Sequence, residues 1–215
     1  MVQSLASGLE YLHTDIKSSA AKPSIAHRDL KSKNILVKNN GTCCLADFGL
    51  SVRSDHFNNL DKKSFHFQVG TRRYMAPEIL DSSINLSTFE SFKKADMYTL
   101  GLVIWEMGQK VTSENNYEYP YQHDVTVDPS VDDMRNIVCT EGKRPVLAPS
   151  WHSGDHAMVD LARIVQECWS GNPDSRLTCL RVKKDLVKLI DNLRHGRDSG
   201  CYYTDSSDQG FISWE

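Results

Sequence analysis

The chain has 215 residues, of which 40% are hydrophobic and 25% are charged, and these values exclude wholesale disorder and a fibrous or collagen-like protein. There are 25 Lys and Arg against 28 Asp and Glu, which gives a net charge of −3. Basic residues are therefore not in excess, and the composition does not predict a nucleic-acid-binding surface. The longest strongly apolar run, LGLVIWEM at residues 100–107, is far shorter than the roughly 20 residues of a membrane span, and no secretory signal is visible.

The N-terminal segment predicts a helix that is already under way near the first residue. Leu5, Leu9 and Leu12 recur at i, i+4 and i+7, which places them on one face of a helix. A polar stretch over residues 13–22 separates this helix from Pro23 and from the most informative part of the sequence.

Two short β-type runs, at residues 35–37 and 43–46, predict a hairpin. They are joined by KNNGT at residues 38–42, in which Asn-Gly supplies the positive φ angles of a tight turn. A hairpin returns the chain to where it began. We therefore expect Asn34, just before the first strand, to lie beside Asp47, just after the second.

The next segment combines a long loop with two helix signals. Residues 49–68 are polar and irregular, and loops of this length tend to be functional or mobile. Pro77 stands where a helix can start, with Glu78 in the first turn. Residues 95–107 are apolar on nearly every side, which indicates a buried helix rather than an amphipathic surface helix.

The C-terminal half is predicted to be mainly helical. After a loop over residues 112–129, helical stretches are expected at residues 131–140, 156–169 and 178–193. Thr178 is a suitable N-cap for the last of them, and Gly196 lies just past its last periodic residue. We therefore expect one domain over residues 1–195 and a disordered tail over residues 196–215, which is rich in Ser, Asp, Gly and Tyr.

Three short motifs occur in a fixed order along the chain. HRDLKSKN at residues 27–34 fits the pattern H-R-D-L-x-x-x-N, DFG occupies residues 47–49, and APE occupies residues 76–78. Any one tripeptide would carry little weight. All three in order, with a hairpin between the first two, indicate the catalytic segment of a protein kinase.

These residue types suit the transfer of a γ-phosphoryl group, which needs positioning and charge neutralisation more than covalent chemistry. We expect Asp29 to accept the proton of the substrate hydroxyl, and Lys31 to reach the transferred phosphate as a point charge. Asn34 and Asp47 would hold Mg²⁺, a hard ion that prefers oxygen ligands. The alternative, that all four are solvated loop residues, leaves their joint spacing unexplained.

Longer strings of the sequence are more specific than these motifs. They are KPSIAHRDLKSKNILVKNNGTCCLADFGL, VGTRRYMAPEIL, INLSTFESFKKADMYTLGLVIWE, DPSVDDMRNIVC, RPVLAPSW and ECWSGNPDSRLTCLRVKKDL. Over roughly residues 3–193 the chain resembles the large, C-terminal lobe of a eukaryotic protein kinase, and specifically the type I receptors of the TGF-β/activin/BMP family. The resemblance implies an α+β, mainly α fold, consisting of the large lobe only, with a short β-hairpin that carries the catalytic loop and DFG.

The resemblance also assigns roles to single residues. Lys31 and Thr71 are typical of the serine/threonine branch, in which the threonine before APE contacts the catalytic aspartate and lysine. Glu78 is expected to pair with Arg176 in a buried ion bridge, and Asp96 to accept backbone N–H bonds from the catalytic loop. Structural roles are also implied for four further motif residues: His27, Arg28, Phe48 and Gly49.

The family further implies a receptor-type protein serine/threonine kinase. It would transfer the γ-phosphate of ATP, with Mg²⁺ or Mn²⁺, to Ser or Thr of receptor-regulated Smad proteins, and Lys31, Asn34 and Asp47 would contact the bound nucleotide and its metal. A type II receptor serine/threonine kinase is the implied partner. The parent would be a single-pass membrane protein with its kinase at the cytoplasmic face of the plasma membrane, and this chain alone would be soluble.

Parts of a complete kinase are not found in the sequence. No two of the 12 glycines are separated by a single residue, so there is no G-x-G-x-x-G loop, and the catalytic loop already begins at residue 27. We therefore expect the small lobe to be absent and the isolated chain to have little or no activity. The alternative hypothesis is a catalytically silent, kinase-derived binding module. Intact Asp29, Lys31, Asn34 and Asp47 favour the kinase.

The absent small lobe has a consequence for the surface. The large lobe normally packs against the small one, so we expect an exposed apolar patch around His27, Phe48 and the hairpin. Without a partner, this patch predicts aggregation or poor expression.

Overall fold

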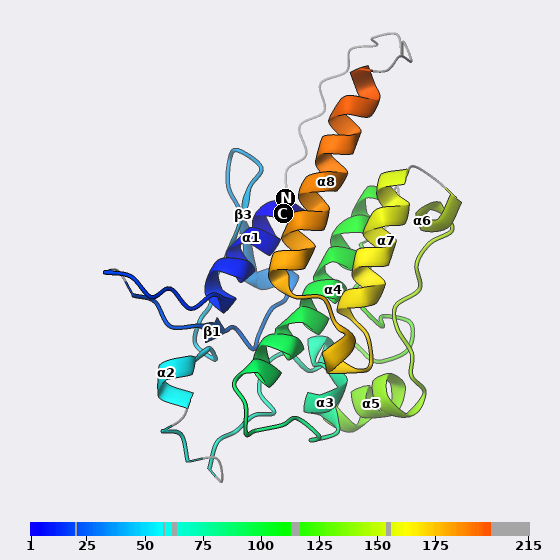
Figure 1. The fold of residues 1–215 in the computed structure, drawn as a ribbon. Coiled ribbons are helices and arrows are strands. Elements are labelled where there is room, and N and C mark those ends of the chain that lie inside the picture. The colour runs from blue at the N-terminus through cyan, green and yellow to red at the C-terminus, as the bar shows by residue number, and fades with distance from the viewer. Residues whose placement is uncertain (20, 58, 62–63, 113–116, 154–155, 199–215) are drawn as a thin grey trace.

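The chain is helix-rich, with a few short strands (Figure 1). The computed structural model describes residues 1–19, 21–57, 59–61, 64–112, 117–153 and 156–198. The α-helices are α1 (Val2–His13), α2 (Ser54–Phe57), α3 (Pro77–Leu80), α4 (Glu90–Thr112), α5 (Val131–Arg135), α6 (Ser150–Ser153), α7 (His156–Cys168) and α8 (Cys179–Asp198). Single turns of other helix types are η1 (Ser32–Asn34), η2 (Arg72–Tyr74), the π-helix η3 (Asn136–Thr140) and η4 (Pro173–Ser175). The strands are β1 (Ile25–Ala26), β2 (Ile35–Val37), β3 (Cys43–Leu45) and β4 (Val52–Arg53).

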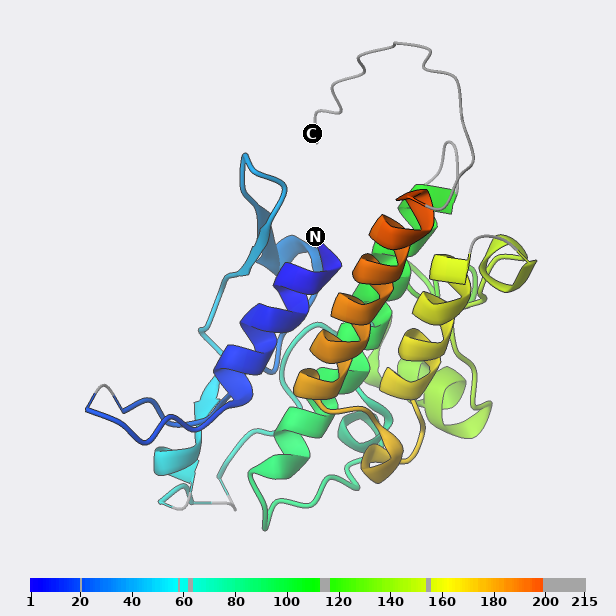
Figure 2. The same ribbon diagram turned by 45° about the horizontal axis from the view of Figure 1, so that its top comes forward.

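The long helices form the body of the molecule around α4. In both views α8 runs beside α1, and α7 packs against α4 (Figures 1 and 2). Along α4, Tyr98, Val103 and Ile104 are at most 1% exposed although they point in different directions around the helix, so the prediction of a helix buried all round is confirmed. The helix extends beyond the predicted residues 95–107 at both ends.

Helix α1 confirms the prediction made from its leucines. Leu5, Leu9 and Leu12 are all buried in the core, and the helix lies against α8 and β3. The predicted start at Pro77 is also confirmed, because Pro77 is the first residue of α3 and Glu78 lies in its first turn.

The predicted hairpin is formed by β2 and β3, which pair antiparallel with Ile35 opposite Leu45. The connecting turn is closed by the Lys38 amide, which donates to the Thr42 carbonyl oxygen over 2.8 Å. Only Gly41 of the Asn-Gly pair has a positive φ, at 74°, so one left-handed residue is enough for this longer turn. The hairpin projects beside the start of α1 (Figure 2).

Two local features differ from the sequence predictions. The irregular loop predicted over residues 49–68 contains β4, which pairs with β1 with Ala26 opposite Val52, and the short helix α2. Strands of two residues carry no periodic pattern that sequence alone could show. The pairing nevertheless ties this segment to the chain just before the catalytic motif.

The C-terminal helix also departs from its predicted end. Thr178 caps α8, since its hydroxyl oxygen accepts a hydrogen bond from the Arg181 amide over 3.3 Å. The helix then continues through Gly196 to Asp198, because a glycine costs a helix only about 1 kcal/mol relative to alanine and Arg194 and Arg197 on either side are good helix formers. Of the tail predicted to be disordered, residues 199–215 lie outside the described residues. No helix among those described is long and apolar enough to cross a membrane.

Candidate active site

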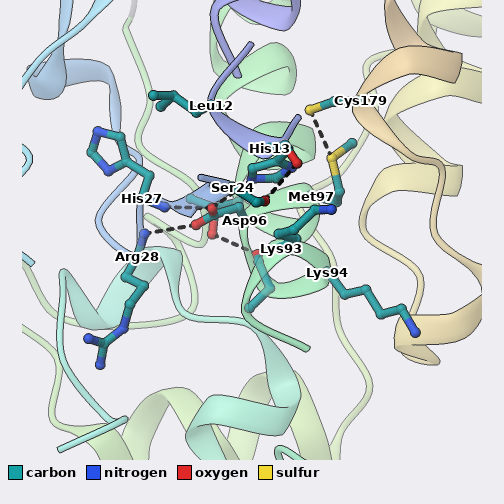
Figure 3. Close-up of polar contacts among 12 residues, drawn as sticks. Leu12, His13, Ser24, His27, Arg28, Lys93, Lys94, Asp96, Met97 and Cys179 are labelled. Atoms are coloured by element: carbon teal, nitrogen blue, oxygen red, sulfur yellow. Dashed lines mark hydrogen bonds and ion pairs between the residues drawn. The ribbon is translucent and has the colours of Figure 1, made fainter. Parts of the chain in front are cut away.

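Helix α4 holds the segment that carries the HRD motif in place through hydrogen bonds. Asp96, in the second turn of α4, is only 2% exposed. Its Oδ2 accepts the backbone N–H of His27 over 2.7 Å, and its Oδ1 accepts the N–H of Arg28 over 2.8 Å (Figure 3). Arg28 has a left-handed φ of 69°, a conformation that non-glycine residues seldom adopt without such support. The buried carboxylate therefore determines the path of the chain into Asp29.

A histidine that sequence reasoning missed completes this anchor. His13, the last residue of α1, places its Nε2 2.9 Å from Asp96 Oδ2, and Figure 3 shows it reaching the carboxylate from the side opposite Arg28. The His13 carbonyl oxygen in turn accepts a hydrogen bond from the Ser24 hydroxyl over 2.7 Å. His13 and Asp96 are 83 positions apart in the sequence, and no local sequence pattern predicts that they pair.

The side chain of Asp29 is the centre of the site. Its Oδ1 accepts hydrogen bonds from the backbone N–H and the hydroxyl of Thr71, each over 2.8 Å. Its Oδ2 accepts from Lys31 Nζ over 2.8 Å and from Asn34 Nδ2 over 3.2 Å. Asn34 Nδ2 also donates to the Asp29 carbonyl oxygen over 2.8 Å, and Lys31 Nζ also donates to Thr71 Oγ1 over 2.9 Å. The structure thus brings together all four residues predicted to act in catalysis.

The electrostatics of this cluster keep Asp29 ionised. Burial by itself raises the pKa of the Asp29 carboxyl, but the hydrogen bonds from Lys31 and Thr71 outweigh it, so the pKa lies below its ordinary value. At neutral pH the side chain is therefore a carboxylate, which can accept a proton.

A glycine allows Thr71 to approach this closely. Gly70 has a φ of 106°, and a Cβ atom built on it would lie 2.6 Å from the carbonyl oxygen of Arg28. Neither the conformation nor the space suits any other residue. The sequence contains Gly70 in the string VGTRRYMAPE, but only the structure shows what the position requires.

The hairpin brings the start of DFG back to the catalytic loop. The Ala46 amide donates to the Asn34 carbonyl oxygen over 2.9 Å, so Asp47 follows directly beside η1. Asp47 is exposed and has a left-handed φ of 63°, and the Gly49 amide donates to its Oδ1 over 3.4 Å. The hairpin thus brings Asp47 back beside Asn34, as predicted. Asp47 lies at the exposed edge of the site.

The donor set at this edge fits a hard divalent ion. Asn34 uses its amide nitrogen in its described hydrogen bonds, which leaves the amide oxygen as its second polar atom, and Asp47 offers carboxylate oxygens. Mg²⁺ and Mn²⁺ prefer such oxygen donors and usually take further ligands from phosphates and water. Among the described residues no group of three or more His, Cys, Asp or Glu is placed to hold a metal ion.

His27 and Phe48 pack together beneath the hairpin, with their ring centroids 5.2 Å apart. His27 Nε2 also lies 3.1 Å from the Ala46 carbonyl oxygen, and the residue is completely buried, so it is not itself part of an exposed patch. Phe48, in contrast, is 45% exposed. The exposed apolar surface near the site is formed by Leu36, Val37, Phe48 and Leu50.

Arg28 holds the segment that follows DFG. Its guanidinium donates to the carbonyl oxygens of Leu50 over 3.2 Å and of His66 over 2.6 Å. It also stacks on the rings of Phe65, at 4.6 Å, and Phe92, at 5.4 Å. Burial lowers the pKa of Arg28 to about 10, which still leaves it a cation at neutral pH.

Glu78 and Arg176 form a bidentate ion pair away from the centre of the site. Arg176 Nη1 and Nη2 donate to the two Glu78 carboxylate oxygens, each over 2.7 Å, and both side chains are buried. Arg176 also donates to the carbonyl oxygens of Lys94 and Ser170. The pair therefore joins α3, α4 and the turn before α8.

The chain is similar in sequence to one family of domains and to several known receptors. Residues 1–187 match the model of the protein kinase domain. The chain is 50% identical over 189 residues to the TGF-beta receptor type-1 of Rattus norvegicus, which covers 86% of this chain and 38% of the receptor. It is 47% identical over 197 residues to the activin receptor type-1 of Homo sapiens, which covers 90% of this chain and 38% of that receptor. The chain thus spans well under half the length of these relatives.

Proposed function

Because the chain belongs to the protein kinase family, on its type I receptor branch, we propose that it transfers the γ-phosphoryl group of ATP to serine or threonine hydroxyls of proteins. The observation that carries this proposal is the hydrogen-bonded cluster of Asp29, Lys31, Asn34 and Thr71. A solvated loop would have no reason to join these four side chains around one buried carboxylate.

We propose a role for three residues of the cluster, and their contacts support it. Asp29, ionised and only 8% exposed, would accept the proton of the attacking hydroxyl. Lys31, which now donates to Asp29 and Thr71, would place its positive charge beside the transferred phosphoryl group. Thr71 fixes the carboxylate with two hydrogen bonds and so determines its orientation.

The metal would be held at the open edge. Asn34 and Asp47 supply oxygen donors there for Mg²⁺ or Mn²⁺, and the ion, when bound, neutralises charge on the phosphates of ATP. Lys31, Asn34 and Asp47 are thus the residues that we propose contact the nucleotide and its metal.

The family supports a finer proposal for the reaction and its setting. We propose that the whole protein phosphorylates receptor-regulated Smad proteins, acts with a type II receptor kinase, and is anchored in the plasma membrane with this domain at the cytoplasmic face. The support is the similarity to receptors named for TGF-beta and activin.

The chain by itself is proposed to be weakly active or inactive. Its 215 residues contain neither a glycine-rich loop nor the strand lysine that usually follows one, so only part of the nucleotide site is supplied. A catalytically silent binding module is the alternative, and the intact cluster argues against it.

A chimera tests the proposal. The small lobe of the human TGF-beta receptor type-1 is fused before Met1, and transfer from labelled ATP to a Smad-type serine peptide is measured. We expect transfer that Asp29→Asn reduces at least about 100-fold, because a general base contributes this much. Asp55→Asn, at an exposed aspartate whose ion pair among the described residues is with exposed Arg53, is the matched control and should leave the rate unchanged.

Two results would contradict it. A folded chimera that binds ATP but transfers no phosphate would favour the silent module. A chimera that carries Asp29→Asn and transfers phosphate as fast as the unsubstituted chimera would remove Asp29 from the mechanism. Robust turnover by the chain without the fused lobe would overturn only the expectation that it is inactive alone.

A further inference from the structure

The β2–β3 hairpin and the segment that follows it present large apolar side chains to solvent. Four of them are between 38% and 56% exposed, and together they are called the hairpin edge: Leu36, Val37, Phe48 and Leu50. Apolar side chains gathered on one part of a surface generally mark a place where another segment or molecule packs. The hairpin edge is therefore a docking surface.

The charge around the hairpin edge is positive. Residues 30–46, which include the hairpin, contain three lysines and no Asp or Glu. Lys31 is bound to Asp29. Lys33 and Lys38 lie on either side of β2 in the chain and are exposed, and the ion pairs among the described residues include neither of them. An occupant that carries carboxylates beside apolar side chains would match this surface in both respects.

The C-terminal part of the sequence has this composition. Residues 199–215 contain three acidic residues, Asp205, Asp208 and Glu215, and no Lys or Arg. They include the string FISWE at residues 211–215, in which three large apolar residues stand next to a carboxylate. The tail is therefore complementary to the hairpin edge in charge and in apolar character.

Helix α8 delivers this tail on the side of the molecule where the hairpin lies. Near the start of α8, Lys183 Nζ lies 3.3 Å from Oε2 of Glu10, in the second half of α1. In both views α8 then runs antiparallel to α1, so that its end and the hairpin project on the same side (Figures 1 and 2). The hairpin is held there by the Cys43 amide, which donates to Ser4 Oγ near the start of α1 over 2.8 Å.

The tail is long enough to cross from α8 to the hairpin. Asp198 lies about 22 Å along α8 from Lys183, and Ser4 lies about 9 Å along α1 from Glu10. Because these helices run side by side in opposite directions, the end of α8 and the base of the hairpin differ in height by about 13 Å. Phe211 is 13 residues beyond Asp198, and a chain of that length rich in Ser, Asp and Gly spans about 20 Å on average. The hairpin edge is therefore within reach of FISWE.

We propose that FISWE, residues 211–215, docks on the hairpin edge of the same chain. Its three large apolar side chains lie against the edge, and the acidic residues of the tail face Lys33 and Lys38. Because the contact is intramolecular, the tail acts at an effective concentration on the order of 1 mM, so a weak contact is enough to hold it.

Two consequences follow from the place of the hairpin edge. Docking within one chain competes with association between chains at the same surface. Phe48 directly follows Asp47, so a docked tail also lies next to the proposed metal site and competes with what binds there. This second consequence rests on the function proposed above, whereas the docking itself does not.

Cross-linking with a carbodiimide tests this inference, because the reagent joins a carboxylate to an amine only where the two are in contact. Equal amounts of unlabelled and ¹⁵N-labelled whole chain are mixed, cross-linked and digested, and the linked peptides are identified by mass spectrometry. We expect links from Asp208 or Glu215 to Lys33 or Lys38, with both peptides of a link carrying the same isotope. Equal shares of same-isotope and mixed pairs would identify a second copy as the occupant and contradict the proposal.

Substitutions on both sides of the contact separate apolar docking from charge attraction alone. Phe211→Ser and Leu36→Ser should each lower the yield of these links at least about fivefold, because each removes a large apolar side chain from the contact. Tyr203→Ser, at an aromatic residue of the same tail outside FISWE, is the matched control and should leave the yield unchanged. Links to Lys188, an exposed lysine of α8, serve as the reference yield within each sample.

Unchanged yields in both Phe211→Ser and Leu36→Ser would overturn the proposal. So would a whole chain in which the tail is linked to Lys188 but not to the lysines beside the hairpin edge. If Leu36→Ser does not fold, Phe211→Ser decides alone, since residue 211 lies beyond the last helix of the described fold. The measurement uses no nucleotide, so its outcome is independent of the phosphotransfer assay.

Discussion

The helical side and the hairpin side of the site are built differently. On the helical side, Asp29 and Asp96 are almost completely buried, and each of their carboxylate oxygens has hydrogen-bond partners. On the hairpin side, Asp47 is exposed, and Leu36 and Phe48 present 56% and 45% of their surface to solvent. The proton acceptor is thus held by the fold itself. The proposed metal ligand lies on an edge that the fold leaves open, where we expect order to depend on what covers it.

The largest expected effect lies on the helical side. Arg176→Ala leaves the buried Glu78 carboxylate without its bidentate partner, which should lower the free energy of unfolding by about 3–5 kcal/mol. The matched variant Arg53→Ala removes an exposed pair with Asp55 and should change it by less than about 1 kcal/mol. Urea denaturation of both variants measures the difference. Equal losses of unfolding free energy in the two variants would contradict the claim that the buried ion pair stabilises the fold more than the exposed one.

An intermediate effect on stability is expected at the contact between His13 and Asp96, next to the catalytic loop. His13→Ala removes one hydrogen bond to Asp96 but leaves the two from His27 and Arg28, so the free energy of unfolding should fall by about 1–3 kcal/mol. His123→Ala, at an exposed histidine paired with Glu118, should have little effect. Thermal unfolding of both variants compares them. A His13→Ala variant as stable as the wild type would show that Asp96 needs only its backbone partners.

The smallest effect on stability is expected at the hairpin edge. Leu36→Ser replaces an exposed side chain and should change the free energy of unfolding by less than about 0.5 kcal/mol. It should nevertheless reduce self-association of the isolated chain, because it removes apolar surface from the patch that contains Phe48. Val127→Ser, at an exposed valine outside this patch, is the control. Sedimentation velocity would contradict the prediction if both variants associated like the wild type.

The sequence predicted the parts of this protein that local patterns determine. The leucine spacing of α1, the apolar run of α4, Pro77 at the start of α3 and the two runs of the hairpin each depend on neighbouring residues. The hairpin also predicted that the catalytic loop and Asp47 lie side by side, because antiparallel pairing leaves little choice. The contacts of Glu78 and Arg176 came from family resemblance and not from any local pattern.

The features that sequence reasoning missed are long-range or depend on three-dimensional space. His13 and Asp96 meet only when α1 packs near α4, and β1 and β4 are too short to show a period. The requirement for Gly70 comes from a carbonyl oxygen of another segment. Glu106 lies among apolar neighbours on α4, and its partners Tyr74 and Tyr117 come from two other segments of the chain.

The most direct test of the central claim is whether one divalent ion contacts both ends of the hairpin. Mn²⁺ with ATP is added to the ¹⁵N-labelled chain, and paramagnetic broadening of the backbone amides is measured, which detects even a small bound fraction. We expect the amides near Asn34 and those of residues 47–49 to broaden together, and Asp47→Ala to abolish the effect at both places. Broadening confined to other parts of the chain, or unchanged in Asp47→Ala, would contradict the account.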